Sequence, residues 1–385
     1  MLSKYISITI FFVIIFNSCQ HSTEPTVSSN SCIYPNGNRN FTWRLDTLGW
    51  FPSTMGGVHA FSDDDVYAGG YFVTMDHSTV YNIIHWNGVK WSPIILSDVI
   101  AQLGNNPIDV SGDDKIMVTV GEYDFENPKP GIGEFNNQTK QWKGYQFQTS
   151  GALRAVWTDG KGYFIASGDN GMVYEKGGYT SEWKYQKAPT DHSLSRIAGV
   201  SKNEIYFRGY KSVAAKLQYE LWRLNNNNWL KLYDHPDSSG MPIIFPKNNM
   251  DRDIGDISVF RCEKTDSLTI NLIGGISYQS RSKGLDLNFK LSNFSDLGLP
   301  LEIMDRSGLR TDYFTPNDHW IVGTRFNFFH WNGINFQQMV IPGLPNDNIT
   351  FGFQRRFKKT KTGKLFIPTQ TGSSQVYVVV QGTPN

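Results

Sequence analysis

The chain has 385 residues and a formal charge of +1, because 36 Lys and Arg residues balance 35 Asp and Glu residues. A charge so close to zero argues against a nucleic-acid-binding protein, in which basic residues are in excess and gather on one face. Aromatic residues make up 14% of the sequence, charged residues only 18%, and there are 36 glycines. This composition, together with the lack of a sustained helical period, favours an all-β chain with many turns.

The first 18 residues have the features of an export signal rather than of a folded segment. Lys4 supplies a positive charge, and Ile6–Phe16 is an apolar run in which only Ser7 and Thr9 are polar. Such a run is too short to span a bilayer as an ordinary helix, but it has the length of a signal-peptide core. We therefore expect Met1–Ser18 to be a signal peptide.

A cysteine stands where the apolar run ends. The sequence Phe16-Asn17-Ser18-Cys19 resembles a bacterial lipobox, in which a small residue precedes a cysteine that becomes acylated and N-terminal. Ser18 fits this pattern, whereas Phe16 and Asn17 depart from its usual residues. The resemblance implies a lipoprotein that is anchored at Cys19 to a membrane of the bacterial cell envelope and faces the periplasm or the cell surface. Ordinary secretion with an incidental cysteine is the alternative.

The segment after Cys19 is predicted to be a flexible tether. Gln20–Asn40 is rich in Ser, Thr, Asn, Pro and Gly and has little apolar surface to bury. The sequence thus divides into a signal peptide (1–18), a lipidated cysteine with its tether (19–40) and one folded domain (41–385). Cys32 and Cys262 could form a disulfide in an oxidising compartment, and two unpaired thiols are the alternative.

The folded domain repeats one pattern. From Gly57 to Trp91, short apolar strands are separated by an acidic turn, by Gly69-Gly70 and by the hairpin signal Asn87-Gly88. Four antiparallel strands in about 45–50 residues make one propeller blade. The second strand of this pattern occurs seven times, at Asp65–Gly70, Lys115–Gly121, Gly162–Gly168, Glu204–Gly209, Ser267–Gly275, His319–Gly323 and Lys364–Gln370.

The two ends of the domain indicate how the ring closes. The sequence ends within five residues of Val376–Val380, so the seventh repeat lacks a fourth strand of its own. Phe41–Leu45 matches the fourth-strand pattern and is predicted to complete this blade, which removes two open edges. About 345 residues at roughly 48 per repeat give seven blades. We therefore predict an all-β fold, a single seven-bladed β-propeller of four-stranded antiparallel blades whose last blade is closed by the N-terminal strand.

Two known kinds of repeat resemble these segments. Gly69-Gly70 and Gly274-Gly275, each followed by an aromatic strand, resemble kelch repeats. Ser167–Tyr174 fits the Asp box S-x-D-x-G-x-x-aromatic of sialidase-like (BNR-like) propellers and is similar to the repeats of photosystem-stability-factor-like propellers. Because Ser167–Tyr174 follows a second strand, we expect an ordinary hairpin there, with a true Asp box as the alternative. The resemblances imply the fold and no particular activity, since propellers host many unrelated functions.

The sequence offers no metal or cofactor motif. It has no H-E-x-x-H, no Cys/His zinc spacing, no Gly-rich phosphate loop and no G-x-S-x-G elbow. Asp251–Asp256 alternates carboxylates but lacks the Glu that closes an EF-hand loop. Asp63–Asp65 and Asp113-Asp114 recur at one turn of successive blades, which favours turn chemistry, and His85 and His330 share one repeat position, which favours a structural role. We expect no cofactor and no metal.

Two groups of residues are candidates for ligand contact. Arg154, Arg196, Arg310 and Arg355 lie in or near first strands and could form an anion-binding channel; charged residues lining a wet channel are the alternative that we favour. Long loops are predicted on one face at Tyr71–Val80, Glu122–Gly131, Tyr210–Gln218, Tyr233–Ile254 and Ile276–Gly284. Loops on a rigid scaffold are a usual place for binding, and sequence drift is the alternative. The predicted ligand-binding residues are Tyr71, Phe72, His77, Tyr123, Phe125, Arg154, Arg196, Tyr210, Tyr278, Arg281 and Arg355.

We therefore expect a monomeric, membrane-anchored binding module for glycan or protein ligands rather than an enzyme. The alternative is a carbohydrate-active, sialidase-like hydrolase or lyase on the same scaffold. That activity would need two carboxyl groups roughly 5–10 Å apart at the mouth of the channel. No catalytic residues can be assigned from their positions in the sequence.

Overall fold

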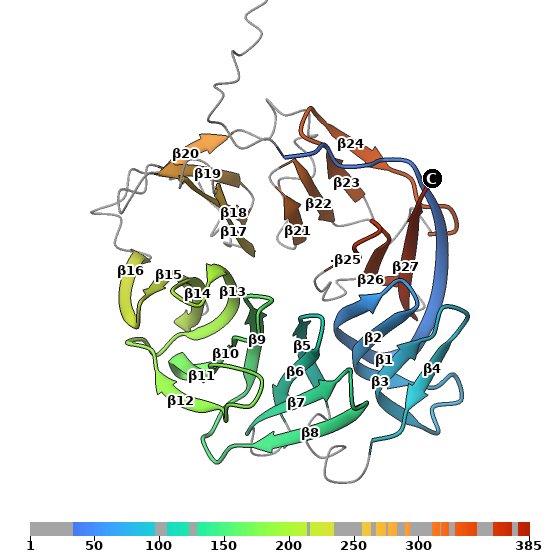
Figure 1. The fold of residues 1–385 in the computed structure, drawn as a ribbon, viewed down its shortest axis with the longest axis horizontal. Coiled ribbons are helices and arrows are strands. Elements are labelled where there is room, and N and C mark those ends of the chain that lie inside the picture. Colours follow the sequence, from blue (N-terminus) through green and yellow to red (C-terminus); the bar gives the residue numbers. More distant parts are fainter. Residues whose placement is uncertain are drawn as a thin grey trace, which may run out of the picture.

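The computed structural model describes residues 34–96, 106–122, 129–213, 216–234, 256–262, 267–274, 276–282, 289–292, 310–315, 317–322, 328–344, 357–371 and 376–385. These residues form sheets of antiparallel strands arranged around a central axis (Figure 1). In each blade the first strand lies nearest the axis and the fourth lies at the rim. This arrangement confirms the predicted all-β, seven-bladed propeller.

Each blade follows the order predicted from the repeats. Blades 1 and 2 contain β1 (Phe41–Ser62), β2 (Asp65–Val73), β3 (Val80–Trp86), β4 (Trp91–Ile94), β5 (Asn106–Gly112), β6 (Ile116–Glu122), β7 (Pro130–Asn136) and β8 (Gln141–Gln146). Blades 3 and 4 contain β9 (Leu153–Thr158), β10 (Phe164–Gly168), the short 3-10 helix η1 (Asp169–Gly171), β11 (Met172–Lys176), β12 (Lys184–Lys187), β13 (Ser193–Ser201), β14 (Glu204–Val213), β15 (Lys216–Asn225) and β16 (Asn228–Asp234). Blades 5 to 7 contain β17 (Asp256–Cys262), β18 (Ser267–Gly274), β19 (Ile276–Ser282), β20 (Phe289–Ser292), β21 (Arg310–Thr315), β22 (Asp318–Val322), β23 (Phe328–Trp331), β24 (Phe336–Met339), β25 (Lys358–Lys359), β26 (Leu365–Thr371) and β27 (Val376–Pro384).

The ring closes through β1, as the sequence predicted. This strand is 22 residues long, and its first half pairs with β27, from Phe41 opposite Pro384 to Gly49 opposite Tyr377. Its second half pairs with β2, so one continuous strand is the outer strand of blade 7 and the inner strand of blade 1. Blades 7 and 1 therefore form a single seven-stranded sheet.

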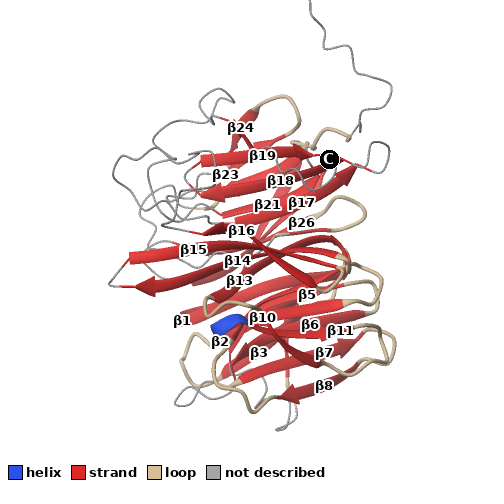
Figure 2. Cartoon of the chain, turned by 90° about the vertical axis from the view of Figure 1, so that its left-hand side faces the viewer, coloured by secondary structure: helices blue, strands red, loops and turns tan. Residues whose placement is uncertain are grey.

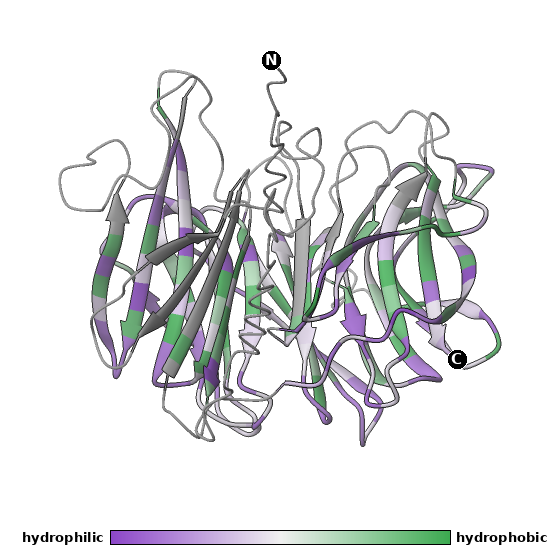
Figure 3. Ribbon diagram, turned by 90° about the horizontal axis from the view of Figure 1, so that it is seen from above, coloured by the Kyte–Doolittle hydropathy of each residue, from purple (hydrophilic) through white to green (hydrophobic). Residues whose placement is uncertain are grey.

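The hydrophobic core lies between the blades. The second and third strands are largely apolar, and successive side chains point to opposite faces, so each blade packs on both neighbours. Hydrophobic residues concentrate in the middle of the strands (Figure 3). In one cluster, Phe366 and Val379 of blade 7 pack with Val66, Ala68 and Trp86 of blade 1. The apolar side chains that point from one blade to the next therefore hold the ring together, as in the packing of one sheet on another.

Polar links between blades recur at the start of the second strands. The Asp65 carboxylate accepts a hydrogen bond from His85 of the same blade at 2.8 Å and one from Lys140 of blade 2 at 3.2 Å. Asp318 and His330 repeat this contact at 2.8 Å in blade 6, and Lys359 of blade 7 pairs with the same carboxylate. The predicted structural role of His85 and His330 is thus confirmed.

The two faces of the ring differ in their connections. We call the side where second strands pass to third strands and one blade passes to the next the connector face, and the opposite side the turn face. In Figure 2, η1 and the tip of the β14–β15 hairpin lie on the connector face, with the hairpin projecting beyond its neighbours, and the C-terminus lies on the turn face. Short turns join the strands on the turn face; at one of them, Asp113 accepts hydrogen bonds from the N–H groups of Lys115 and Ile116 at 2.8 and 2.9 Å.

Two predicted loops are strands. Lys211 pairs with Gln218 and Tyr210 with Tyr219, so Tyr210–Gln218 belongs to the hairpin formed by β14 and β15, each of ten residues. Ile276–Gly284 is occupied mostly by β19, which pairs with β18 directly after residue 275. Both segments were predicted as loops because they contain many polar residues. A strand with a solvent-exposed face can carry such residues.

The last seven residues of the predicted tether lie against blade 6. Gly37 donates its N–H to the Asn317 carbonyl at 3.1 Å, and the Asn317 amide donates to the Tyr34 carbonyl at 2.8 Å. Arg39 donates to the His330 carbonyl at 2.9 Å and to the Asn335 side chain at 2.7 Å. These contacts are on the turn face, so we call 34–40 the turn-face strap.

Some sequence predictions lie outside the described residues, among them the signal peptide, Cys19, Cys32, Arg355, most of Asp251–Asp256 and the 235–255 part of the long connector. Cys262 is buried at the end of β17 and takes part in a disulfide whose partner is outside the described residues, so the pairing with Cys32 stays a prediction. No helix in the described part of the chain is long and apolar enough to cross a membrane. Within the described ranges, no group of three or more His, Cys, Asp or Glu side chains could hold a metal ion.

Candidate functional site

The predicted contact residues of blade 1 separate into exposed and buried ones. Tyr71 and Phe72 belong to β2 rather than to a loop, and Phe72 is only 1% exposed, packed among Met55, Ile84 and Tyr377. Phe72 is therefore a core residue, and its assignment to ligand binding is wrong. His77 lies exposed in the 74–79 loop of the connector face.

The other aromatic candidates are only partly described. Tyr123 and Phe125 lie outside the described residues, and for Tyr278 and Arg281 only the backbone is described. Tyr278 pairs with Leu272 within β19, whereas Arg281 pairs with Thr269 near the turn face. Arg281 therefore does not share the connector-face end of its blade with the other candidates, because the strand continues where a loop was predicted.

Arg154 and Tyr210 come together at the connector-face ends of blades 3 and 4, whereas Arg196 lies further along β13 and donates to the Ser195 carbonyl at 2.9 Å. Arg154 in β9 donates two hydrogen bonds to the Asp169 carboxylate, at 3.0 and 2.9 Å. Asp169, in η1 between β10 and β11, also accepts from the Ala152 N–H at 3.0 Å and from the Ser193 hydroxyl of blade 4 at 2.8 Å. The expected ordinary hairpin is thus found at Ser167–Tyr174, and its Asp joins two blades.

The Asp169 carboxyl is held ionised. Burial alone would raise its pKa, but the hydrogen bonds from Arg154, Ala152 and Ser193 outweigh burial and keep the pKa below its ordinary value. A two-pronged Arg–carboxylate contact is a rigid, charge-assisted arrangement. Arg154 is thereby fixed in direction, with about a third of its side chain exposed on the connector face.

The β14–β15 hairpin carries the next part of the site. The Arg208 guanidinium lies 5.6 Å from the Tyr210 ring centre and 5.0 Å from that of Tyr219, and it donates to the Ser195 hydroxyl at 2.9 Å. These contacts stiffen the base of the hairpin. Further out, the exposed Lys211 pairs with Asp191, which lies just before β13.

A third carboxylate is saturated by donors. Glu220 of β15 accepts from Lys231 at 2.6 Å, from Thr190 at 2.5 Å and from the Trp222 indole at 2.8 Å. Burial would raise its pKa, but these donors leave the pKa lowered. We call the whole set the blade 3–4 cluster, namely Arg154, Asp169, Asp191, Ser193, Arg208, Tyr210, Lys211 and Glu220.

The cluster has the chemistry of a binding surface rather than of a hydrolytic centre. A glycosidase needs a carboxylic acid whose pKa is raised so that it can donate a proton. Asp169, Asp191 and Glu220 all have lowered pKa values, and each is bonded to a cation. Fixed charges and aromatic rings can recognise a ligand without transferring a proton.

The sequence revealed only one side of this cluster. First-strand position indicated Arg154 and Arg196, and the predicted loop indicated Tyr210. Asp169 was visible as part of the Ser167–Tyr174 motif, but no pattern linked it to Arg154. Ser193, Arg208 and Glu220 carried no signal, because their partners are set by blade packing and strand register.

Comparisons with known proteins bear on the fold. No family model matches the chain, and no curated protein matches its sequence. Among solved structures, the chain is similar to YCF48 bound to D1 peptide, with a TM-score of 0.58, 14% identity and coverage of 91% of this chain and 98% of that one. The fold is a β-propeller.

Two WD40 propellers are similar at comparable levels. The WD40 β-propeller domain of Doa1 has a TM-score of 0.51 and 12% identity, covering 90% of this chain and 98% of that one. The RRP9 WD40 repeats have a TM-score of 0.53 and 10% identity, covering 91% and 100%. At such low identities the likeness extends to the propeller architecture and no further.

Proposed function

We propose that this propeller is a binding module that holds an extended segment of another protein on its connector face. The observation that carries the proposal is the blade 3–4 cluster, in which charged and aromatic side chains are fixed by one another while Arg154 and Lys211 remain partly exposed. Fixed side chains lose little entropy when a ligand binds, which favours affinity.

Blade 1 adds apolar contact surface on the same face. Phe51, Met75 and Val80 are exposed there. They are near one another because Trp50 pairs with Val73, and Val73 with Val80. A face that carries both exposed apolar residues and charged ones is typical of surfaces that contact proteins. A segment with acidic and apolar side chains would complement both parts of the face.

A similar propeller provides a precedent for this kind of ligand. The structure described as YCF48 bound to D1 peptide shares the architecture across nearly the whole of both chains. We also propose that the repeats are related to kelch and sialidase-like repeats. This relation implies no activity.

We also propose that the module is a lipoprotein of the bacterial cell envelope, anchored at Cys19. The turn-face strap supports this arrangement, because it brings the N-terminal chain onto the propeller at the face opposite the blade 3–4 cluster. An anchor upstream of residue 34 would then leave the connector face directed away from the membrane and open to a partner.

The experiment compares binding with turnover. The full chain is immobilised and panned with a random dodecapeptide phage library, and in parallel it is incubated with fluorogenic glycosides, including a sialoside. We expect synthetic copies of enriched peptides to bind saturably and the glycosides to stay intact. Glycoside turnover without peptide enrichment would instead establish the hydrolase alternative.

A further inference from the structure

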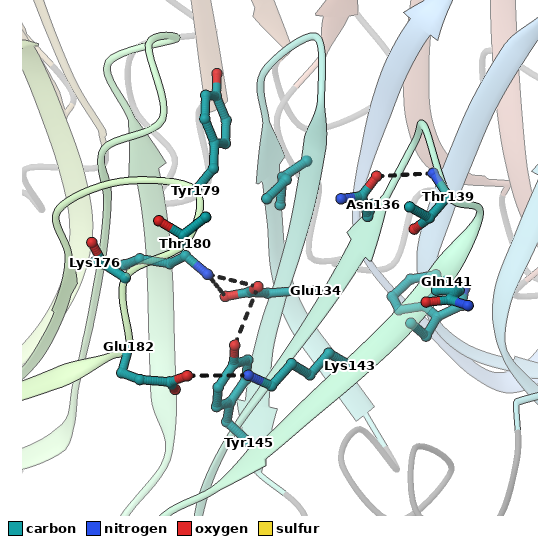
Figure 4. Close-up of a pocket in the computed structure, with 13 residues that line it drawn as sticks. Glu134, Asn136, Thr139, Gln141, Lys143, Tyr145, Lys176, Tyr179, Thr180 and Glu182 are labelled. Carbon is teal, nitrogen blue, oxygen red and sulfur yellow. Dashed lines mark hydrogen bonds and ion pairs between the residues drawn. The ribbon is translucent and has the colours of Figure 1, made fainter.

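A pocket opens between blades 2 and 3 on the turn face, away from the blade 3–4 cluster (Figure 4). Its volume is about 450 Å³, within the range of small-molecule sites. Blade 2 lines it from β7 and β8, and blade 3 lines it from the end of β11 and the loop that follows.

The base of the pocket is a buried ion pair between the blades. The Lys176 ammonium donates to both Glu134 oxygens at 2.9 Å, and the two residues are only 2% and 6% exposed. Glu134 also accepts from the Trp183 indole at 2.5 Å and from the Tyr145 hydroxyl at 3.4 Å. Because these donors occupy the Glu134 oxygens, the carboxylate is suited to holding its neighbours in position and not to transferring a proton.

The loop over the pocket is longer than a strand connection requires. The third-to-fourth-strand turns at 87–90, 137–140, 226–227 and 332–335 are short, whereas blade 3 uses 177–183. This loop reaches back to blade 2, where the Tyr179 hydroxyl donates to Asp113 at 2.9 Å and the ring lies beneath the Lys115 ammonium. Hairpin connections shorten to a few residues when nothing else is required of them, so the extra residues indicate a use.

The charges that line the pocket cancel. Lys176 is paired with Glu134, and across the mouth Lys143 of blade 2 is paired with Glu182 of blade 3 at 3.3 Å. No net field remains to attract a charged ligand. The outer pair is highly exposed and is therefore weak, so a ligand can displace it at little cost.

The remaining lining groups are neutral donors, acceptors and rings. The Asn136 side-chain oxygen is used by its own turn, which leaves the amide N–H groups for a ligand. Gln141, Thr180 and Ser181 add an amide and two hydroxyls. The rings of the pocket are those of Tyr145 and Tyr179. Trp142 is on the other face of blade 2, where its indole packs on Phe135 toward blade 1.

We propose that this pocket binds a neutral saccharide of one or two rings. A sugar needs donors and acceptors in equal measure together with an aromatic surface for its C–H face, and the pocket supplies both without a net charge. The site lies on the face opposite the peptide-binding surface, so this inference does not depend on the proposed function.

The test uses the full chain and a defined panel: glucose, galactose, N-acetylglucosamine and their β-1,4-linked dimers. Binding is detected by saturation-transfer NMR and measured by calorimetry. We expect saturable binding of at least one sugar, weakened at least tenfold by Tyr145→Ala, which removes a ring of the pocket. Tyr185→Ala, which removes an exposed tyrosine of the fourth strand of blade 3 outside the pocket, serves as the matched control and keeps the affinity.

Tyr145 packs partly against the core between blades 2 and 3 and donates its hydroxyl to Glu134, so a second variant avoids the core. Ser181→Trp fills the pocket from the loop and should abolish sugar binding while the melting temperature stays near that of the wild type. Lys211→Glu, on the connector face, should leave sugar affinity unchanged. Lack of binding to every sugar of the panel, or wild-type affinity in both pocket variants, would overturn the inference.

Discussion

At the scale of single residues, Tyr71 and Phe72 are consecutive in β2 but have opposite environments. Phe72 is enclosed by the core of blades 1 and 7, whereas Tyr71 is only partly buried. Truncating a fully buried Phe removes contacts and leaves a cavity, so we expect Phe72→Ala to lower the free energy of unfolding by about 3–5 kcal/mol. Tyr71→Ala should cost about 1 kcal/mol or less. Urea denaturation of the two variants measures this, and equal losses would show that Phe72 is not in the core.

His319 gives the fold a dependence on pH. Its ring is enclosed in blade 6, stacked on Trp331 with ring centres 5.9 Å apart. Burial, reinforced by the neighbouring His330, lowers its pKa from 6.5 to about 3. Below pH 6.5 the unfolded chain therefore binds a proton at His319, whereas the folded protein does not. The stability that is present above pH 6.5 is lost as the pH falls toward 3.

The loss from this one group approaches about 1.4 kcal/mol per pH unit. We expect His319→Phe, which keeps an aromatic ring at the site, to flatten the fall in unfolding free energy between pH 6.5 and 4. Denaturation curves at several pH values compare the variant with the wild type. Parallel pH profiles for the two proteins would contradict the account of His319.

At the scale of elements, closure depends on the first half of β1. Deleting Phe41–Leu48 removes the outer strand of blade 7, together with Leu48 and the partly buried Trp43 and Leu45. Burial of each large apolar side chain contributes about 1.5–3 kcal/mol, so we expect a loss of several kcal/mol and an exposed strand edge. A deletion of 20–33, which stops short of the turn-face strap, is the control. Equal unfolding free energies for the two deletions would refute closure by this strand.

A single substitution tests the same contact. Gly382 pairs with Trp43, and a Cβ there would lie 2.5 Å from the indole ring. Gly382→Val should therefore push Trp43 out of its place and lower the melting temperature. Gly177→Val, at a position with open space around it, is the matched control.

Elements were predictable from the sequence where local chemistry decides them. All seven predicted second strands overlap strands of the structure, because short apolar runs, six of which end in glycine, mark them independently of their neighbours. The end of β14 and the whole of β19 were predicted as loops, because pairing with a partner strand, rather than composition, keeps them extended. Pro368, which has no N–H group to donate, lies in the second strand β26 opposite Val379. The described pairing of β26 with β25 ends at Phe366 and does not reach this proline.

The sites were less predictable than the strands, since their partners are distant in sequence. Arg154 was identified, but its partner Asp169 comes from another strand connection and Ser193 from the next blade. The pocket between blades 2 and 3 depends on Glu134 meeting Lys176 and on Asp113 meeting Tyr179. These contacts join different blades, so they cannot be predicted from a sequence pattern that repeats within each blade.

At the scale of the whole molecule, the lipid anchor is the first matter to test. If Cys19 is acylated, the wild-type protein should partition with membranes, because several acyl chains on one residue anchor more stably than one. Cys19→Ala should release the protein or block its maturation. Detergent phase separation and mass spectrometry of the N-terminal peptide provide the measurement. Soluble wild-type protein with an intact Cys19 thiol would refute the anchor.

The central claim is that partners bind at the connector face, and two surface lysines test it most directly. Lys211 pairs with Asp191 on the connector face, and Lys361 pairs with Asp114 on the turn face, with side chains 43% and 82% exposed. Both belong to surface ion pairs, so Lys211→Glu and Lys361→Glu should change stability equally little. The measurement is the affinity of each variant for the peptides selected on the wild-type protein, by calorimetry. We predict at least tenfold weaker binding for Lys211→Glu and unchanged binding for Lys361→Glu; the reverse result would mean that the protein presents the opposite face to its partners.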